Sequence, residues 1–296
     1  MASDGLARFL LESSDVRGEF VQLESIWKEV TGRTDYPAPV RRLLGEAMSA
    51  VALMAATIKF DGSLILQIRG TGPVHMLVVQ ATGENTMRGL ARWRGEVPES
   101  GLAGQVGDGR MVITIDPGAG KERYQSIIEV AGDNLASSLD RYFANSEQLP
   151  TRFWLAAGTE RCAGFLLQRI PKGDASREEV EQNDESWNYS VAVAETLDDD
   201  ELLRWPAEML LRRLFPDRPV RLFDGPAFEF RCGCSRETIE TTLRALGRAE
   251  LVETLEEEGE IRVDCEFCAA SYVYDAVDVE GLFAGSSGSQ TAAGTH

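Results

Sequence analysis

The sequence has little of what most hydrolytic and nucleotide-dependent enzymes require. Histidine occurs only at His75 and His296 among 296 residues, so a Ser/His/Asp or Cys/His catalytic arrangement would have to use His75. The chain contains no G-x-x-x-x-G-K-[ST] loop, no G-x-G-x-x-G turn and no G-x-S-x-G elbow. We interpret His75 as an ordinary strand histidine, so hydrolytic or acid/base catalysis has few residues to use.

Basic residues are scarce relative to acidic ones. The 48 aspartates and glutamates outnumber the 30 lysines and arginines, which gives a formal net charge of -18. Nucleic-acid binding draws its affinity from lysine and arginine side chains that displace counterions from phosphates. We therefore expect no nucleic-acid partner.

Long apolar runs are also missing. No stretch approaches the roughly 18 uninterrupted apolar residues of a membrane-spanning helix. The first 20 residues lack a basic region followed by an apolar run of signal length. We expect a cytoplasmic protein with no membrane partner.

The acidic residues are distributed unevenly and divide the chain. Residues 1–173 are almost neutral, residues 174–205 carry 11 acidic and 2 basic residues, and residues 227–284 carry 14 acidic and 5 basic residues. The last residues are small and polar, so they cannot bury enough apolar surface to offset the entropy of ordering. We predict four parts: an N-terminal core over 1–173, an acidic, metastable helical linker over 174–226, a small module over 227–284 and a disordered tail over 285–296.

Hydrophobic periodicity predicts an α+β fold, with a large helix-plus-antiparallel-sheet domain at the N-terminus. Apolar residues recur at helical spacing over 37–56, and the pair Asp61-Gly62 that follows is typical of a hairpin turn. Asp133 is placed to cap a helix over 134–145. Strand-like runs occupy 58–68, 74–81, 87–93, 111–116, 126–131, 151–157 and 162–170.

The acidic linker contains two amphipathic segments, at 190–197 and 206–215, and Thr196 is placed to cap the short run DDDELL. Their apolar faces must pack against another part of the chain, while repulsion among the acidic residues keeps the linker marginally stable. We hypothesise that the C-terminal module holds this linker docked on the core, and that loss of the module's structure releases it and exposes apolar surface.

Four of the five cysteines form the strongest local signal in the sequence. Cys232 and Cys234 form a C-x-C pair, and Cys265 and Cys268 form a C-x-x-C pair thirty residues further on. Two close thiol pairs supply four soft ligands, which suits one tetrahedral Zn²⁺ per chain. The fifth cysteine, Cys162, lies in an apolar run and is interpreted as a buried thiol without a role.

The residues around these cysteines predict a small scaffold. Ser235 can cap a helix over 236–246, and a second helix over 249–258, strands at 260–264 and 271–275 and a closing helix over 276–283 follow. A module of about 60 residues obtains only about 3–5 kcal/mol from its own core. A structural zinc site contributes an apparent ~10–16 kcal/mol. The module should therefore unfold when zinc is removed.

Metal ligation keeps the sulfurs as thiolates, the form that oxidants attack, so oxidation would eject the metal. The spacing alone leaves the disulfide pairing open, because local pairs would close tiny loops whereas cross-pairs would close a loop of about 30 residues and stabilise the module by about 3–4 kcal/mol. Two other functions also remain open. One is a thiol-disulfide oxidoreductase that uses Cys265 and Cys268, and the other is a zinc-ribbon interaction module.

At these residues the sequence resembles the 33 kDa chaperonin family, the redox-regulated heat-shock chaperones of the bacterial cytoplasm. The resemblance covers most of the chain and includes TGPVHMLVVQ, NTMRGLAR, the run SEQLPTR at 146–152, FEFRCGCSRETIETTLRALGRAEL and the ungapped C-x-C plus C-x-x-C pattern. It implies that Cys232, Cys234, Cys265 and Cys268 ligate zinc, whereas Cys162 matches none of the family's cysteines.

The resemblance also implies a mechanism. The reduced, zinc-bound form is inactive, and oxidation forms the local disulfides Cys232–Cys234 and Cys265–Cys268, releases zinc and unfolds the linker. The oxidised form is then a dimeric holdase that binds unfolding client proteins without ATP, so the resemblance predicts that the protein is not an enzyme. Neither the resemblance nor the residues identify the surface that binds clients.

Overall fold

The computed structural model describes residues 4–12, 14–57, 62–118, 120–130, 133–170 and 177–284. They form two compact units that divide between Arg231 and Cys232, called here the first and second units. Among the described residues, no helix combines the length and apolar character needed to cross a membrane.

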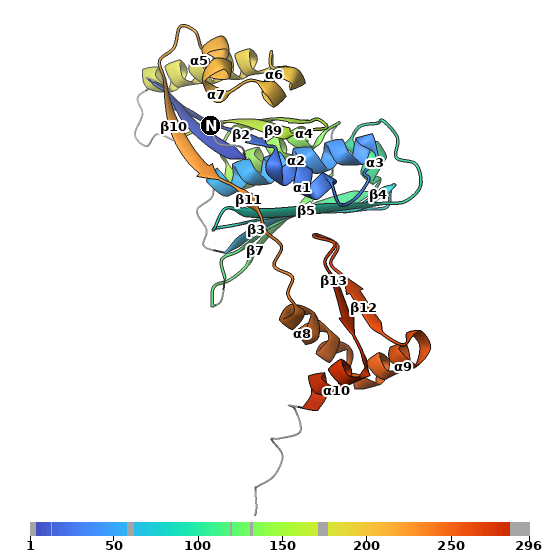
Figure 1. Ribbon diagram of the computed structural model, residues 1–296. Coiled ribbons are helices and arrows are strands. Elements are labelled where there is room, and N and C mark those ends of the chain that lie inside the picture. Colours follow the sequence, from blue (N-terminus) through green and yellow to red (C-terminus); the bar gives the residue numbers. More distant parts are fainter. Residues whose placement is uncertain are drawn as a thin grey trace, which may run out of the picture. The chain divides into compact units, whose positions relative to one another are not determined.

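The first unit contains two sheets (Figure 1). Neighbouring strands are antiparallel in the five-stranded sheet, of order β10-β1-β2-β9-β8. The six-stranded sheet has the order β11-β5-β4-β3-β6-β7, in which the β11–β5 pair is parallel. Its strands and those of the five-stranded sheet are β1 (Gly5–Leu11), β2 (Val16–Leu23), β3 (Ser63–Gly70), β4 (Val74–Thr82), β5 (Thr86–Trp93), β6 (Gly109–Asp116), β7 (Tyr124–Glu129), β8 (Thr151–Ala157), β9 (Cys162–Arg169), β10 (Val220–Ala227) and β11 (Glu229–Phe230).

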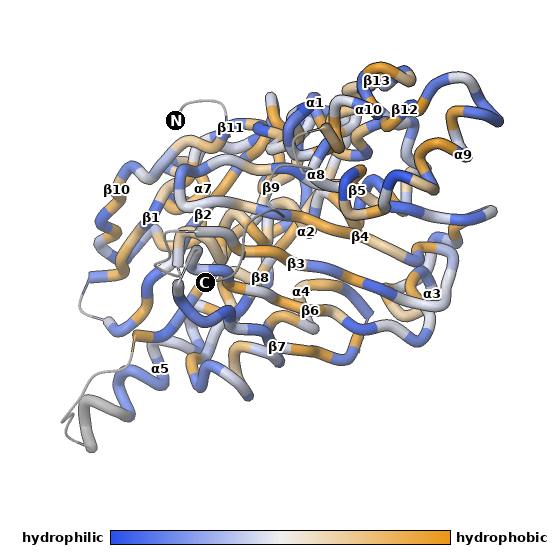
Figure 2. The backbone as a smooth tube through the Cα atoms, turned by 90° about the horizontal axis from the view of Figure 1, so that it is seen from below, coloured by the Kyte–Doolittle hydropathy of each residue, from blue (hydrophilic) through white to orange (hydrophobic). Residues whose placement is uncertain are grey.

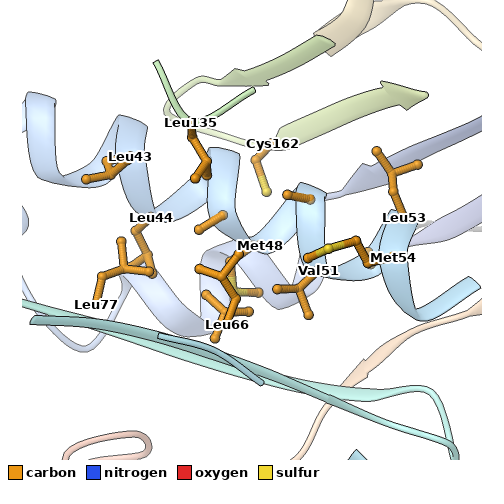
Figure 3. Close-up of a cluster of buried hydrophobic side chains, with 14 of the residues drawn as sticks. Leu43, Leu44, Met48, Val51, Leu53, Met54, Leu66, Leu77, Leu135 and Cys162 are labelled. Atoms are coloured by element: carbon orange, nitrogen blue, oxygen red, sulfur yellow. The ribbon is translucent and has the colours of Figure 1, made fainter. Parts of the chain in front are cut away.

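The helix α2 (Ala38–Thr57) lies between the two sheets and forms the centre of the main core. Met48 and Val51 point toward Leu66 on the six-stranded sheet, while Cys162 lies on the opposite side of the helix (Figure 3). Hydrophobic residues also recur along β3, β4 and β6 (Figure 2). Because apolar residues occupy more than one face of α2, the helix is buried on both sides. The other helices that contribute to this core are α1 (Ser25–Thr31), α3 (Leu102–Val106), α4 (Leu135–Tyr142) and the π-helical turn Phe143–Glu147.

These elements confirm the α+β prediction for the N-terminal core. The helix expected over 37–56 is α2, and the strand pair expected at 151–157 and 162–170 is the hairpin of β8 and β9. The other predicted strands correspond to β3 through β7. Residues 58–61, which include Asp61 of the expected hairpin turn, lie outside the described residues.

Two predicted helix caps were wrong. The cap of α4 is Asn134 instead of Asp133, because the Asn134 side chain accepts a hydrogen bond from the Ser137 N–H at 2.8 Å. The cap of α6 (Asp199–Arg204) is Asp198 instead of Thr196, since Asp198 and Glu201 form a reciprocal capping box.

The linker helices cover the face of the five-stranded sheet that points away from α2. These helices are α5 (Arg177–Ala194), α6 and α7 (Ala207–Leu214). They pack on aromatic residues of the sheet, among them Phe9, Phe20 and Phe165, and Gln22 donates hydrogen bonds to the carbonyl oxygens of Leu202 and Trp205. The linker residues buried in this cluster, called here the linker cluster, are Ala194, Leu202, Ala207, Leu210, Leu211, Leu214 and Phe215.

After the linker helices the chain returns to both sheets. The strand β10 pairs with β1 at the edge of the five-stranded sheet, and β11 then pairs with β5. The chain leaves the first unit directly after β11, since the N–H of Arg231 still donates to the carbonyl of Met87. The division of the chain at 173, 226 and 284 stays a prediction, and residues 285–296 lie outside the described residues.

The second unit is small and has its own core. Its elements are α8 (Arg236–Leu246), α9 (Arg248–Glu258), β12 (Ile261–Asp264), β13 (Ser271–Tyr274) and α10 (Ala276–Ala284), which confirm the elements predicted for this module. The strands β12 and β13 form an antiparallel hairpin. Only six described side chains of the unit form its buried cluster: Leu243, Leu251, Ile261, Tyr274, Val279 and Leu282.

Candidate metal centre

Two turns of the second unit carry the four cysteines. Cys232 and Cys234 directly precede α8, whose N-cap Ser235 accepts a hydrogen bond from the Thr238 N–H at 3.1 Å. This confirms the predicted cap, and it ties the C-x-C pair to the start of a helix. Cys265 and Cys268 lie in the connection between β12 and β13.

The C-x-x-C turn is held by backbone hydrogen bonds. The Ala269 N–H donates to the Cys265 carbonyl at 2.7 Å, and the Cys265 N–H donates to the Ala270 carbonyl at 2.8 Å. Ala269 has a φ of 55°, in the left-handed region that is unfavourable for a residue with a Cβ atom. This backbone conformation costs some conformational free energy, but it brings both thiols of the pair to the same side of the hairpin end.

The four Sγ atoms converge at one point. All lie within 4.8 Å of one another, with Cys232 and Cys265 separated by 3.5 Å and Cys234 and Cys268 by 3.1 Å. A regular tetrahedron with metal–sulfur bonds of about 2.3 Å has sulfur–sulfur distances of about 3.8 Å. The donor set therefore fits a tetrahedral metal ion, and the structure brings together all four residues that the sequence singled out.

The electrostatics of the cluster also favour a cation. The Tyr272 hydroxyl donates a hydrogen bond to Cys234 Sγ at 3.4 Å, and it lowers the pKa of Cys234 to about 7. Burial raises the pKa of the neighbouring Cys268 thiol to about 12. Four thiolates at these separations repel one another, so they can all ionise only when a metal ion supplies positive charge.

The two remaining sequence candidates lie elsewhere. Cys162 is fully buried on β9, and burial raises its pKa to about 12, so it is not a reactive thiolate. This confirms its interpretation as a buried thiol. His75 lies on β4, as expected, and its Nδ1 is buried without a hydrogen-bond partner in the described part of the chain.

The sequence did not identify Tyr272 as part of the site. The run 271–275 predicts only a strand, because nothing in it distinguishes a tyrosine near a sulfur from one in the core. The signal that could have found it is the hairpin register, in which Asp264 is paired with Ser271 and Val263 with Tyr272. Tyr272 therefore lies beside the strand end that delivers Cys265.

Comparison with known proteins identifies the family. Residues 4–275 match the model of the Hsp33 protein family. The chain is 47% identical over 280 residues to the 33 kDa chaperonin of Nitrosococcus oceani, covering 95% of this chain and 94% of that protein. It is 44% identical over 297 residues to the 33 kDa chaperonin of Azotobacter vinelandii, covering 99% of each.

A solved structure supports the fold. The 33 kDa chaperonin (heat shock protein 33 homolog) of Thermotoga maritima superposes with a TM-score of 0.80, at 23% identity, covering 94% of this chain and 97% of that chain. The resemblance noted in the sequence is thus confirmed by the family match, by relatives aligned over nearly the whole chain and by the shared fold. The chain belongs to the Hsp33 family of 33 kDa chaperonins.

Proposed function

We propose that this chain is a redox-regulated, ATP-independent chaperone in which Cys232, Cys234, Cys265 and Cys268 hold one zinc ion in the reduced state. The observation that carries the proposal is the convergence of the four Sγ atoms within 4.8 Å of one another. Four thiolates favour zinc over hard cations such as magnesium or calcium. When bound, the ion cross-links the C-x-C and C-x-x-C turns and supplies most of the stability of the second unit.

The small core of the second unit makes its fold depend on these ligands. Six buried side chains cannot by themselves offset the entropy of ordering about 50 residues. Anything that removes the thiolates therefore unfolds the unit. Oxidation does so, since two thiolates, one hydrogen peroxide and two protons yield one disulfide and two water molecules.

We propose that the disulfides formed are Cys232–Cys234 and Cys265–Cys268. In the folded cluster the cross-pairs are also close, since Cys232 Sγ lies 3.5 Å from Cys265 Sγ and Cys234 Sγ lies 3.1 Å from Cys268 Sγ. Once the unit begins to unfold, however, thiols separated by one or two residues meet far more often than thiols separated by thirty. The local pairing leaves the unit without a cross-link, which agrees with a switch that activates by unfolding.

The linker helices are the segment that this switch would release. In the proposal, residues 174–226 act as the metastable linker, and their departure uncovers the aromatic side chains of Phe9, Phe20 and Phe165 on the five-stranded sheet. A covalent route joins the two events, because β10 and β11 connect the linker helices directly to Cys232. Uncovered aromatic surface of this kind binds apolar segments of unfolding client proteins, and it also favours homodimers of the oxidised chain.

The proposal is tested by following zinc content and client protection in one sample. The reduced protein should hold one zinc ion per chain and fail to suppress the heat aggregation of a model protein. Treatment with peroxide at mildly elevated temperature should remove the zinc and produce stoichiometric protection without ATP. Zinc retained on oxidation, or lost without protection, would contradict the switch.

A pair of variants assigns the effect to the cluster. Cys265→Ser removes one ligand and should lose zinc and protect clients even when reduced. Cys162→Ala removes the buried cysteine of the first unit and should bind zinc and respond to peroxide as the unmodified chain does. Equal zinc affinity in the two variants would refute the ligand assignment.

A further inference from the structure

One side chain that is not a ligand candidate contacts the cysteine cluster through a hydroxyl group. Tyr272 on β13 donates a hydrogen bond to Cys234 Sγ at 3.4 Å, while its ring packs against the core of the second unit. A phenol hydroxyl carries its proton at neutral pH, whereas a thiolate can only accept, so the tyrosine is the donor in this contact.

The backbone fixes this contact. Tyr272 is paired with Val263 across the β12–β13 hairpin, and Val263 lies two residues before Cys265 in the chain. Tyr274 lies two residues further along the same strand, so its side chain projects from the same face of the hairpin. The hydroxyl of Tyr274 donates to the Arg236 carbonyl at 3.3 Å. The two tyrosines thus bind the start of α8 at two points, one at a sulfur and one at a backbone oxygen.

We propose that Tyr272 is a positioning residue of the metal centre. Its hydroxyl orients Cys234 Sγ toward the other three sulfurs and withdraws electron density from that thiolate. Residues that do not bind the metal themselves can support it by hydrogen bonding to a ligand. Loss of such a hydrogen bond typically lowers metal affinity by 10–100-fold. The same bond reduces the nucleophilicity of the sulfur, so it also slows the reaction of Cys234 with peroxide and raises the oxidant level at which the site is lost. The inference rests on the proposed zinc site.

A merely structural role is the alternative, because Tyr272 also packs in the core of the second unit. The chain offers a matched pair of variants to separate the two roles. Tyr272→Phe keeps the ring and removes the hydroxyl that contacts sulfur, whereas Tyr274→Phe keeps the ring and removes a hydroxyl that contacts only backbone. Because folding of the second unit and metal binding are coupled, both variants weaken zinc binding to some degree. Affinity alone is therefore an insufficient measure.

The absorption spectrum of the full-length chain, loaded with cobalt(II) in place of zinc, provides a measurement that a change in folding stability does not alter. Sulfur-to-cobalt charge-transfer bands report the energy of the sulfur lone pairs, which a hydrogen bond stabilises. Tyr272→Phe should shift these bands to longer wavelength, and Tyr274→Phe should leave them in place. In the zinc form, Tyr272→Phe should raise the dissociation constant by about tenfold, the lower end of the range for such hydrogen bonds. It should also release zinc faster in peroxide than Tyr274→Phe does.

The outcomes separate this inference from the proposed function. Bands of Tyr272→Phe that superimpose on those of the unmodified chain would overturn the positioning role, as would equal rates of zinc release in the two variants. If the unmodified chain showed no tetrahedral thiolate spectrum at all, the proposed zinc site would fail first. A band shift confined to Tyr272→Phe, with faster zinc release, would support the assignment.

Discussion

Docking of the linker should depend on single buried leucines of α7. Leu210 is 0% exposed in the linker cluster, whereas the adjacent Met209 is 51% exposed on the same helix. Truncating a buried leucine to alanine costs about 3 kcal/mol or more, because the transfer free energy is lost and a cavity remains. Since about 1.4 kcal/mol corresponds to a factor of ten, Leu210→Ala should raise the undocked population of the linker by about 100-fold. The exposed Met209→Ala should change it by no more than about 0.5 kcal/mol.

The assay compares these two variants in the reduced, zinc-loaded state. Hydrogen exchange should be faster across residues 177–214 in Leu210→Ala, and this variant should suppress client aggregation without any oxidant. Zinc content should stay at one ion per chain in both, because the substitution lies in the first unit. The reasoning would be refuted if Leu210→Ala showed no faster hydrogen exchange and no greater client protection than Met209→Ala, since docking would then not depend on the linker cluster.

Three further predictions follow from the geometry. Chelation of zinc should abolish the helical signal and exchange protection of the second unit while β1 to β9 stay protected, because the first unit has its own core; uniform loss would contradict this. Burial raises the pKa of Glu19 to about 7, so the folded state favours its protonated form, and stability should fall by up to about 3 kcal/mol as pH rises from 4.5 through 7. Urea unfolding at pH 5 and 8 should show this fall in the unmodified chain and a smaller one in Glu19→Gln. Because Ala269 has a positive φ, Ala269→Gly should maintain or raise the thermal midpoint of the second unit, and Ala269→Val should lower it, as calorimetry would measure.

The linker packs against the rest of the first unit although its composition is strongly acidic. Polar contacts as well as apolar ones hold it against the rest of this unit. Arg152 on β8 lies 3.2 Å from Asp140 and 3.0 Å from Glu195, which joins α4 to the end of α5 through one guanidinium group. These ion pairs are partly exposed and contribute little individually. Most of the docking free energy therefore comes from the linker cluster, which is why the leucine variants are the sharper test.

The sequence by itself determined the elements whose residues carry a single strong pattern. Helical spacing over 37–56 predicted α2, and the spacing of Cys232, Cys234, Cys265 and Cys268 predicted the cluster. Local signals suffice to predict such features because a helical period or a ligand motif can be recognised from residues that are close in the sequence. The predicted caps Asp133 and Thr196 missed by one or two positions, since several polar residues in each run can supply an N-cap.

Only the tertiary structure decided the rest. The strands β1 and β2 escaped prediction because neither shows a clean alternation of apolar and polar residues. Both faces of β2 are buried, with Phe20 toward the linker and Val21 toward α2. On β1 the exposed face carries the apolar Leu10 beside Arg8. Strand β10 occupies the end of the predicted linker and is a sheet strand because it pairs with β1. The contact of Tyr272 with Cys234 depends on the register of one hairpin. Pairing between distant segments sets each of these features, and no local pattern records such pairing.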